Sequence, residues 1–247
     1  MAERQSDLAI YLIAVFILGI ITGSFLNVCI YRIPAKKSII FPPSSCPKCK
    51  KIIKWYDNIP LLSYMILGGK CRHCHKTIAI TYPIVEILTG IIFIIFFLKF
   101  GLEKIYFYYI IVSSYMIILA LIDINRKIVP DGIVVLLLLT GFLFGIYGLR
   151  QDVTIFDGVI GALTGGLIIY FLNFFSNGKI GEGDIKLMTA LGFLCGTKDI
   201  IYIIFLAFII GAVVSLIMLA LKKYGRKDEI AFVPFIAIAF MAKGLLF

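Results

Sequence analysis

The stretch Gly181-Glu-Gly-Asp184-Ile-Lys186-Leu-Met places a carboxylate where an apolar helix begins. The glycines let the backbone approach its neighbours closely, and a carboxylate next to lipid is costly. A second acid, Asp123, ends the apolar run Ile117-Ile-Leu-Ala-Leu-Ile122. Two costly acids in matching positions indicate that the chain keeps them for a purpose.

The composition indicates a membrane protein. Of the 247 residues, 61% are hydrophobic and 15% are charged, whereas soluble domains are nearer half apolar and a quarter charged. Several apolar runs approach the roughly 20 residues that a bilayer requires. We predict an all-α polytopic membrane protein with about eight transmembrane helices. They are expected at 8–31, 82–98, 105–122, 132–149, 158–175, 186–197, 199–221 and 231–246.

One polar segment, 32–81, separates the first two predicted spans. At about 50 residues it is too small to hold much of a core without a staple. We therefore predict three parts: a first transmembrane helix at 1–31, a four-cysteine domain at 32–81, and a transmembrane core at 82–247.

The basic residues predict the orientation. The net charge is +10, and most lysines and arginines fall in loops on one side of the predicted spans, including 32–81. By the positive-inside rule, this side is cytoplasmic and the N-terminus is outside. Asp123 and Asp184 then both lie at the cytoplasmic face. This placement of charge indicates contact with anionic lipids and no nucleic-acid partner.

Four cysteines form two Cys-x-x-Cys pairs, Cys46-Pro-Lys-Cys49 and Cys71-Arg-His-Cys74. Pairs at this separation are typical of a tetrahedral zinc site, and four thiolates close the coordination sphere, so the predicted zinc is structural. A redox dithiol and reactive cysteines without metal are the alternatives. His73 or His75 could also replace a cysteine ligand.

Two neighbouring carboxylates can hydrolyse a peptide bond. One is charged and takes a proton from water, and the other is protonated and polarises the carbonyl. We predict that Asp123 and Asp184 form this catalytic pair, with Gly181, Gly183 and Lys186 as its supporting loop. Alternatively, each acid only caps a helix, or Lys186 only anchors to lipid phosphate. Two other acids, Asp131 and Glu182, are rival members of the pair.

In the order of its motifs, the chain resembles the type IV prepilin peptidases over nearly its whole length. The motifs that carry the resemblance are Gly23-Ser-Phe-Leu-Asn27, Arg32-Ile-Pro34, Cys46-Pro-x-Cys49, Asn58-Ile-Pro60, Ser63-Tyr64, Gly69-Lys-Cys71-Arg-x-Cys74, Tyr82-Pro-x-x-Glu86, Leu121-Ile-Asp123, Pro130-Asp131 and Gly181-Glu-Gly-Asp184. Two positions depart from the family's pattern. Glu182 stands where an apolar residue is common, and Val233 stands where glycine is frequent.

The resemblance implies a membrane aspartyl endopeptidase of the bacterial inner membrane, with Asp123 and Asp184 catalytic. It would cleave the leaders of prepilins or pseudopilins after glycine on the cytoplasmic side. It would also methylate the new N-terminus from S-adenosylmethionine, although no glycine-rich nucleotide loop identifies cofactor-binding residues.

Two other classes compete with the peptidase. A proton- or cation-coupled transporter would place its acids near mid-bilayer, whereas these acids lie at span ends. A zinc-stapled scaffold would not need either aspartate for its function.

Overall fold

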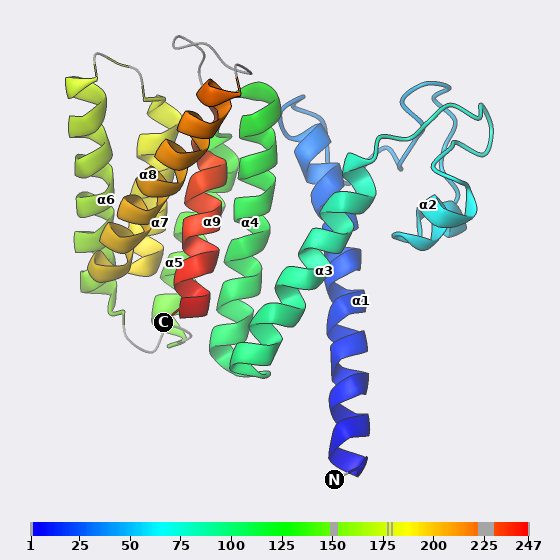
Figure 1. Ribbon diagram of the computed structural model, residues 1–247, viewed down its shortest axis with the longest axis horizontal. Helices are drawn as coiled ribbons and strands as arrows, with labels where there is room; N and C mark the ends of the chain where they lie inside the picture. The colour runs from blue at the N-terminus through cyan, green and yellow to red at the C-terminus, as the bar shows by residue number, and fades with distance from the viewer. Residues whose placement is uncertain (1, 149–152, 177, 179, 222–229, 247) are drawn as a thin grey trace. The chain divides into compact units, whose positions relative to one another are not determined.

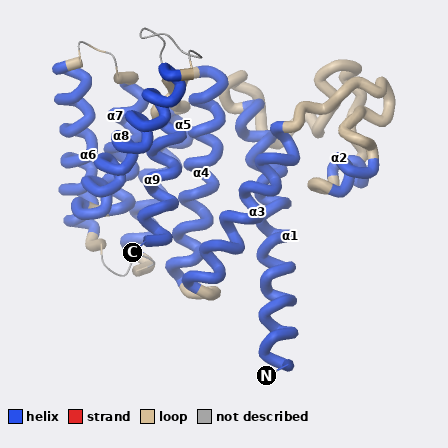
Figure 2. The backbone as a smooth tube through the Cα atoms, viewed as in Figure 1, coloured by secondary structure: helices blue, strands red, loops and turns tan. Residues whose placement is uncertain are grey.

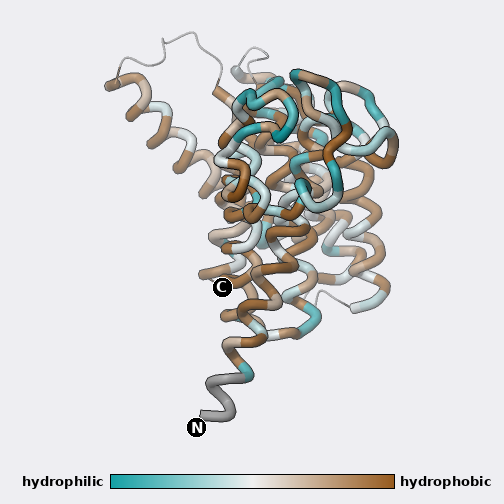
Figure 3. Tube along the Cα trace, turned by 90° about the vertical axis from the view of Figure 1, so that its right-hand side faces the viewer, coloured by the Kyte–Doolittle hydropathy of each residue, from teal (hydrophilic) through white to brown (hydrophobic). Residues whose placement is uncertain are grey.

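The computed structural model describes residues 2–148, 153–176, 178, 180–221 and 230–246. These residues form helices joined by loops, with no strand among them (Figures 1 and 2). The chain divides into two compact units, Met1–Leu102 and Glu103–Phe247. Apolar helices dominate both units, and the loop segment of the first is largely hydrophilic (Figure 3).

In the first unit, two long helices pack closely through glycines. They are α1 (Ala2–Arg32) and α3 (Thr81–Phe100). A Cβ atom on Gly19 would lie 2.6 Å from the Cα atom of Gly90, and one on Gly23 would lie 2.8 Å from the Cα atom of Glu86. Larger residues at these positions would force the helices apart.

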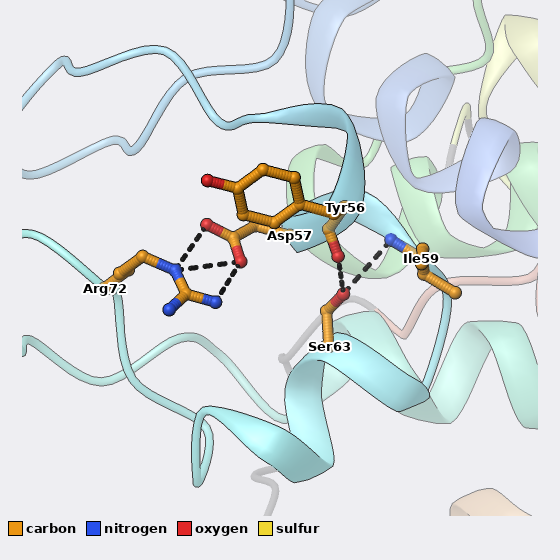
Figure 4. Close-up of polar contacts among 5 residues, drawn as sticks. All are labelled: Tyr56, Asp57, Ile59, Ser63 and Arg72. Carbon is orange, nitrogen blue, oxygen red and sulfur yellow. Dashed lines mark hydrogen bonds and ion pairs between the residues drawn. The ribbon is translucent and has the colours of Figure 1, made fainter.

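The segment between these helices consists of loops with two short helical pieces, η1 (Trp55–Asn58) and α2 (Leu62–Ile66). It contains a fork of charge-assisted hydrogen bonds (Figure 4). Arg72 Nε lies 3.0 and 2.8 Å from the two Asp57 carboxylate oxygens, and its Nη2 lies 2.6 Å from one of them. Beside the fork, Ser63 Oγ donates to the Tyr56 carbonyl and accepts from the Ile59 N–H. These bonds fix the second cysteine pair against η1 and α2.

The second unit is a helical bundle in which successive helices run in opposite directions (Figure 1). They are α4 (Lys104–Arg126), α5 (Asp131–Ile146), α6 (Ile155–Phe175), α7 (Glu182–Cys195), α8 (Thr197–Ala220) and α9 (Val233–Leu246). Each helix runs opposite to the one before it in the chain. The last residues of α4 therefore lie at the same end of the bundle as the first residues of α7 and α9 (Figure 1).

Helix α7 lies in the interior of this bundle. Leu187, Leu191 and Leu194 are fully buried. A Cβ atom on Gly192 would collide with the Gly161 carbonyl of α6, and the reverse also holds. The two glycines therefore let α6 and α7 approach backbone to backbone, which sets the position of α7 in the bundle.

The predicted fold class is confirmed: the chain is all-helical, with a four-cysteine segment between its first two long helices. A helix covers each predicted span, and five are long and apolar enough to cross a membrane. Helices α5 and α9 are shorter apolar helices, and α7 has 14 residues. The count of eight spans, the domain limits and the orientation stay predictions. Residue 149 and the basic loop 222–229 lie outside the described residues.

The ion pair in Figure 4 predicts a pH dependence. The Arg72 guanidinium holds the pKa of Asp57 below its usual value. Because the folded-state pKa is the lower one, the stabilisation is present at neutral pH and is lost as pH falls through it, below about 4. Asp57→Asn should therefore weaken hydrogen-exchange protection of residues 69–78 at pH 7, and this effect should shrink as pH falls below about 4.

Arg72→Gln is the matched variant, and the double substitution completes a cycle. If the two single effects simply add at pH 7, the pair does not act as a unit.

Candidate active site and metal centre

Asp123 lies in the last turn of α4, and its side chain is only 7% exposed. Its Oδ2 atom accepts a hydrogen bond of 3.0 Å from the backbone N–H of Val233, the first residue of α9. Helix α4 ends just beyond it, where Lys127 adopts a left-handed conformation and donates its N–H to the Asp123 carbonyl. Asp123 is thus fixed between the end of one helix and the start of another.

Asp184 is the third residue of α7, and its backbone N–H donates to the Gly181 carbonyl at 3.0 Å. Gly181 precedes the helix with an extended backbone. A Cβ atom at that position would lie 3.5 Å from Asp184 Oδ2. The Asp184 carboxylate therefore lies next to the backbone of Gly181, with no side chain between them.

Gly183 brings the two acidic segments together. A Cβ atom on this residue would lie 2.8 Å from the Cβ atom of Val129, in the loop that follows α4. Glycine thus lets this loop pack on the first turn of α7. The carboxylates of Asp123 and Asp184 are close enough to repel each other electrostatically. The second unit therefore brings these two predicted residues together.

The other charged residues of the predicted site lie at the surface. Lys186 Nζ binds Asp131 Oδ1 at 2.8 Å, with side-chain exposures of 54% and 72%. Glu182 is also exposed. Asp131 is thus occupied by an ion pair outside the bundle, and Lys186 contacts this acid rather than either member of the pair.

Sequence reasoning missed the role of Val233 and α9. The run Phe232-Val233-Pro234-Phe235 drew attention only as a departure from a family pattern. A proline next to the start of an apolar helix is nevertheless a known N-terminal signal, and a helix start has N–H groups that need acceptors. The proline could therefore have indicated a helix start at this point, whose free N–H groups need an acceptor such as an acidic side chain.

The predicted cysteine ligands meet in the first unit. The Sγ atoms of Cys46, Cys49, Cys71 and Cys74 all lie within 4.8 Å of one another. Two of the separations are 3.9 and 4.0 Å. A tetrahedral zinc with Zn–S bonds of about 2.3 Å requires sulfur atoms about 3.8 Å apart. The donor set and its spacing therefore fit a zinc ion.

The two cysteine pairs fold into the same turn. Cys46 N–H donates to the Lys51 carbonyl, and Cys71 N–H donates to the Lys76 carbonyl, both at 2.9 Å. Each turn places its fifth residue in a left-handed conformation, Lys50 in one case and His75 in the other. A hydrogen bond from the Cys49 N–H lowers the pKa of Cys46 to about 6. Such turns present thiolates in the way that zinc knuckles do.

A cavity of about 610 Å³ lies in the first unit, among the end of α1, the cysteine segment and the start of α3. Glu86 lines it from α3 and accepts the Leu61 N–H at 2.9 Å. Asn27 lines it from α1 and donates to the Tyr82 carbonyl at 3.0 Å. The Glu86 bond joins the cysteine segment to α3, and the Asn27 bond joins α1 to α3.

Comparisons with known proteins match both parts of the chain. Residues 17–100 match the Bacterial Peptidase A24 N-terminal domain, and residues 110–216 match the Type IV leader peptidase family. No solved structure matches the chain.

Three curated relatives are named prepilin leader peptidase/N-methyltransferase. The one from Pectobacterium carotovorum is 34% identical, covering 91% of this chain and 89% of the relative. The one from Bacillus subtilis is 32% identical, covering 90% and 89%. The one from Pseudomonas aeruginosa is 30% identical, covering 93% and 88%. Matches of this extent, with the family's two domains in order, mean that the chain belongs to the type IV leader peptidase family.

Proposed function

We propose that this protein is a multi-pass inner-membrane aspartyl endopeptidase that removes the leader of type IV prepilins or pseudopilins after a glycine, on the cytoplasmic side. The observation that carries the proposal is the meeting of Asp123 and Asp184 at one end of the second unit. The names of the relatives support the substrate class. The basic loops support the sidedness.

The geometry suits hydrolysis by a carboxylate pair. Two acids at close range share one proton at neutral pH, so one carboxylate is a base and the other is an acid. Asp123 and Asp184 would hold a water between them, aligned with the scissile carbonyl. The Gly181 backbone beside Asp184 leaves room for an extended peptide chain.

Asparagine substitution of either catalytic acid tests the pair. Asp123→Asn and Asp184→Asn should each lower prepilin cleavage by about a hundredfold or more, because each removes one acid–base partner. Cleavage is measured on prepilin in detergent with equal amounts of folded enzyme.

Asp131→Asn is the control, since this acid lies at the same end of the bundle but is bound to Lys186 at the surface. It should cut within about threefold of wild type, as surface substitutions usually do. Wild-type rates in both catalytic variants would refute the pair.

The four-cysteine centre would hold a structural zinc ion. Cys46, Cys49, Cys71 and Cys74 would supply all four ligands, which leaves no open position for a substrate. Their segment has little secondary structure and few buried residues. The bound metal would therefore supply much of its folding free energy.

Metal analysis tests this centre. Freshly isolated, reduced protein should contain about one zinc per chain, and Cys46→Ser and Cys74→Ser should each reduce the zinc content sharply. Cys29→Ser, at a buried cysteine of α1, should leave it unchanged. Wild-type protein with no zinc would contradict the assignment.

The methyl transfer named in the relatives would use S-adenosylmethionine. The cavity of the first unit has a size typical of small-molecule sites. Among the described residues, the Glu86 carboxylate in its wall accepts a backbone N–H but pairs with no cation. A carboxylate in this position suits a positively charged sulfonium or ammonium group, and Tyr31 and Tyr82 offer faces for an adenine.

Equilibrium binding tests this site. Glu86→Gln keeps an acceptor for the Leu61 N–H but removes the charge. It should weaken S-adenosylmethionine binding by about tenfold, the loss of one charged contact. Binding of S-adenosylhomocysteine, which lacks the sulfonium charge, should change less. Equal weakening of both ligands, or of neither, would argue against a charge-recognising cavity.

A further inference from the structure

The amino end of α9 has backbone N–H groups that its own helix cannot satisfy. The Phe232 carbonyl accepts the N–H groups of Phe235 and Ile236, at 3.0 and 3.3 Å. Pro234 has no N–H. The N–H of Val233 has no acceptor in its own helix, and Asp123 Oδ2 accepts it at 3.0 Å. The N–H of Phe232, just before the helix, also faces this carboxylate. A catalytic acid from α4 thus caps α9.

This bond makes the environments of the two acids unequal. Asp123 is buried and faces the positive end of the α9 dipole, and Lys127 adds positive potential nearby. Asp184 is half-buried in the first turn of α7, at the positive end of that helix's own dipole, and its local donor is the backbone of Gly181, just before the helix. Among the described residues, Asp184 accepts no hydrogen bond from another helix.

The other charged groups at this end do not cancel the difference. Lys186 is bound to Asp131, and Glu182 is exposed to solvent, where its charge is screened. A hydrogen bond to the charged form of a buried acid favours that form, and a like charge nearby disfavours a second one. One negative charge shared by the pair is therefore favoured on Asp123.

We propose that the amino end of α9 assigns the roles in the pair: Asp123 is the base, Asp184 is the acid, and Val233 is a positioning residue that acts through Asp123. This inference rests on the proposed peptidase function. As the water oxygen bonds to the scissile carbon, Asp123 takes a water proton and Asp184 gives its proton to the carbonyl oxygen. Asp184 then regains a proton from the resulting diol as the C–N bond breaks, and Asp123 protonates the leaving nitrogen.

Proline at position 233 removes the donor with little disturbance of the helix. Val233 is the first residue of α9, where proline is tolerated because its fixed φ suits the helix. Val233→Ala is the matched control, since it also shortens the buried side chain but keeps the N–H. Both variants are purified as the full chain, and their thermal unfolding is compared before assay.

Cleavage kinetics then separate a role in chemistry from a role in folding. Val233→Pro should lower kcat by roughly ten- to a hundredfold with KM within about twofold, the effect of losing one hydrogen bond to a charged group in the transition state. The acid limb of its kcat profile should move to higher pH. Val233→Ala, which keeps the N–H, should have a higher kcat than Val233→Pro, and the acid limb of its profile should not move. Equal kcat values and equal profiles in the two variants would overturn the proposal.

A second measurement does not depend on the folding of Val233→Pro. In Asp184→Asn the base remains and an amide donor replaces the protonated acid, whereas Asp123→Asn removes the base. Residual cleavage by Asp184→Asn should exceed that by Asp123→Asn by about tenfold, within the range of acid–base contributions. Equal residual cleavage by the two variants, or more cleavage by Asp123→Asn than by Asp184→Asn, would overturn the assigned roles. Wild-type rates in both would instead refute the peptidase pair itself.

Discussion

A carboxylate buried at the end of an apolar helix has to be bound by something, because an unpaired charge there is strongly unfavourable. In this protein the hydrogen bond between Asp123 and the Val233 N–H meets that requirement. The same bond gives the Val233 N–H, at the start of α9, an acceptor that its own helix does not supply. The same bond joins α4 to α9 at the end of the bundle where α7 begins (Figure 1).

The glycines of the second unit serve the same arrangement. Gly161 and Gly192 let α6 and α7 touch along their backbones, and Gly183 lets the loop after α4 rest on the first turn of α7. Any side chain at Gly192 or Gly183 would move Asp184 relative to Asp123. The signature around Asp184 is therefore a packing requirement as much as a chemical one, and the exposed Glu182 is tolerated because it points away from that packing.

The first unit solves a different problem. Its cysteine segment has little core of its own. Two repeated cysteine turns, the Arg72–Asp57 fork and the bond from the Leu61 N–H to Glu86 hold it, and the Asn27 bond ties α1 to α3 at its base. The buried acid Glu86 is explained in part by the backbone donor that it binds. No ion pair joins Glu86 to a cation among the described residues, which is the reason to connect the adjoining cavity with a cationic ligand.

Much of this could be predicted from the sequence, for identifiable reasons. Long continuous apolar runs predict helices because a helix satisfies every backbone group within its own segment, as lipid requires. Paired Cys-x-x-Cys motifs predict a shared centre because each turn presents two thiolates. The contact that holds Asp123 could not be predicted in this way. It joins residues 110 positions apart. Its donor is a backbone N–H, which almost every residue type has, so the sequence does not identify it. The surface pairing of Lys186 with Asp131 was hidden for a similar reason, since it depends on how α5 and α7 pack.

The proposed peptidase site requires Asp123 and Asp184 to face each other in the membrane-bound protein. Thiol cross-linking in native membranes tests this directly. The double variant Asp123→Cys/Asp184→Cys, treated with a short bifunctional thiol-reactive reagent, should keep α4 and α7 linked after proteolysis between them. Asp123→Cys/Asp199→Cys, whose second position begins α8 at the far end of the bundle, should not link. Efficient linking in the control, or none in the test pair, would contradict a shared site.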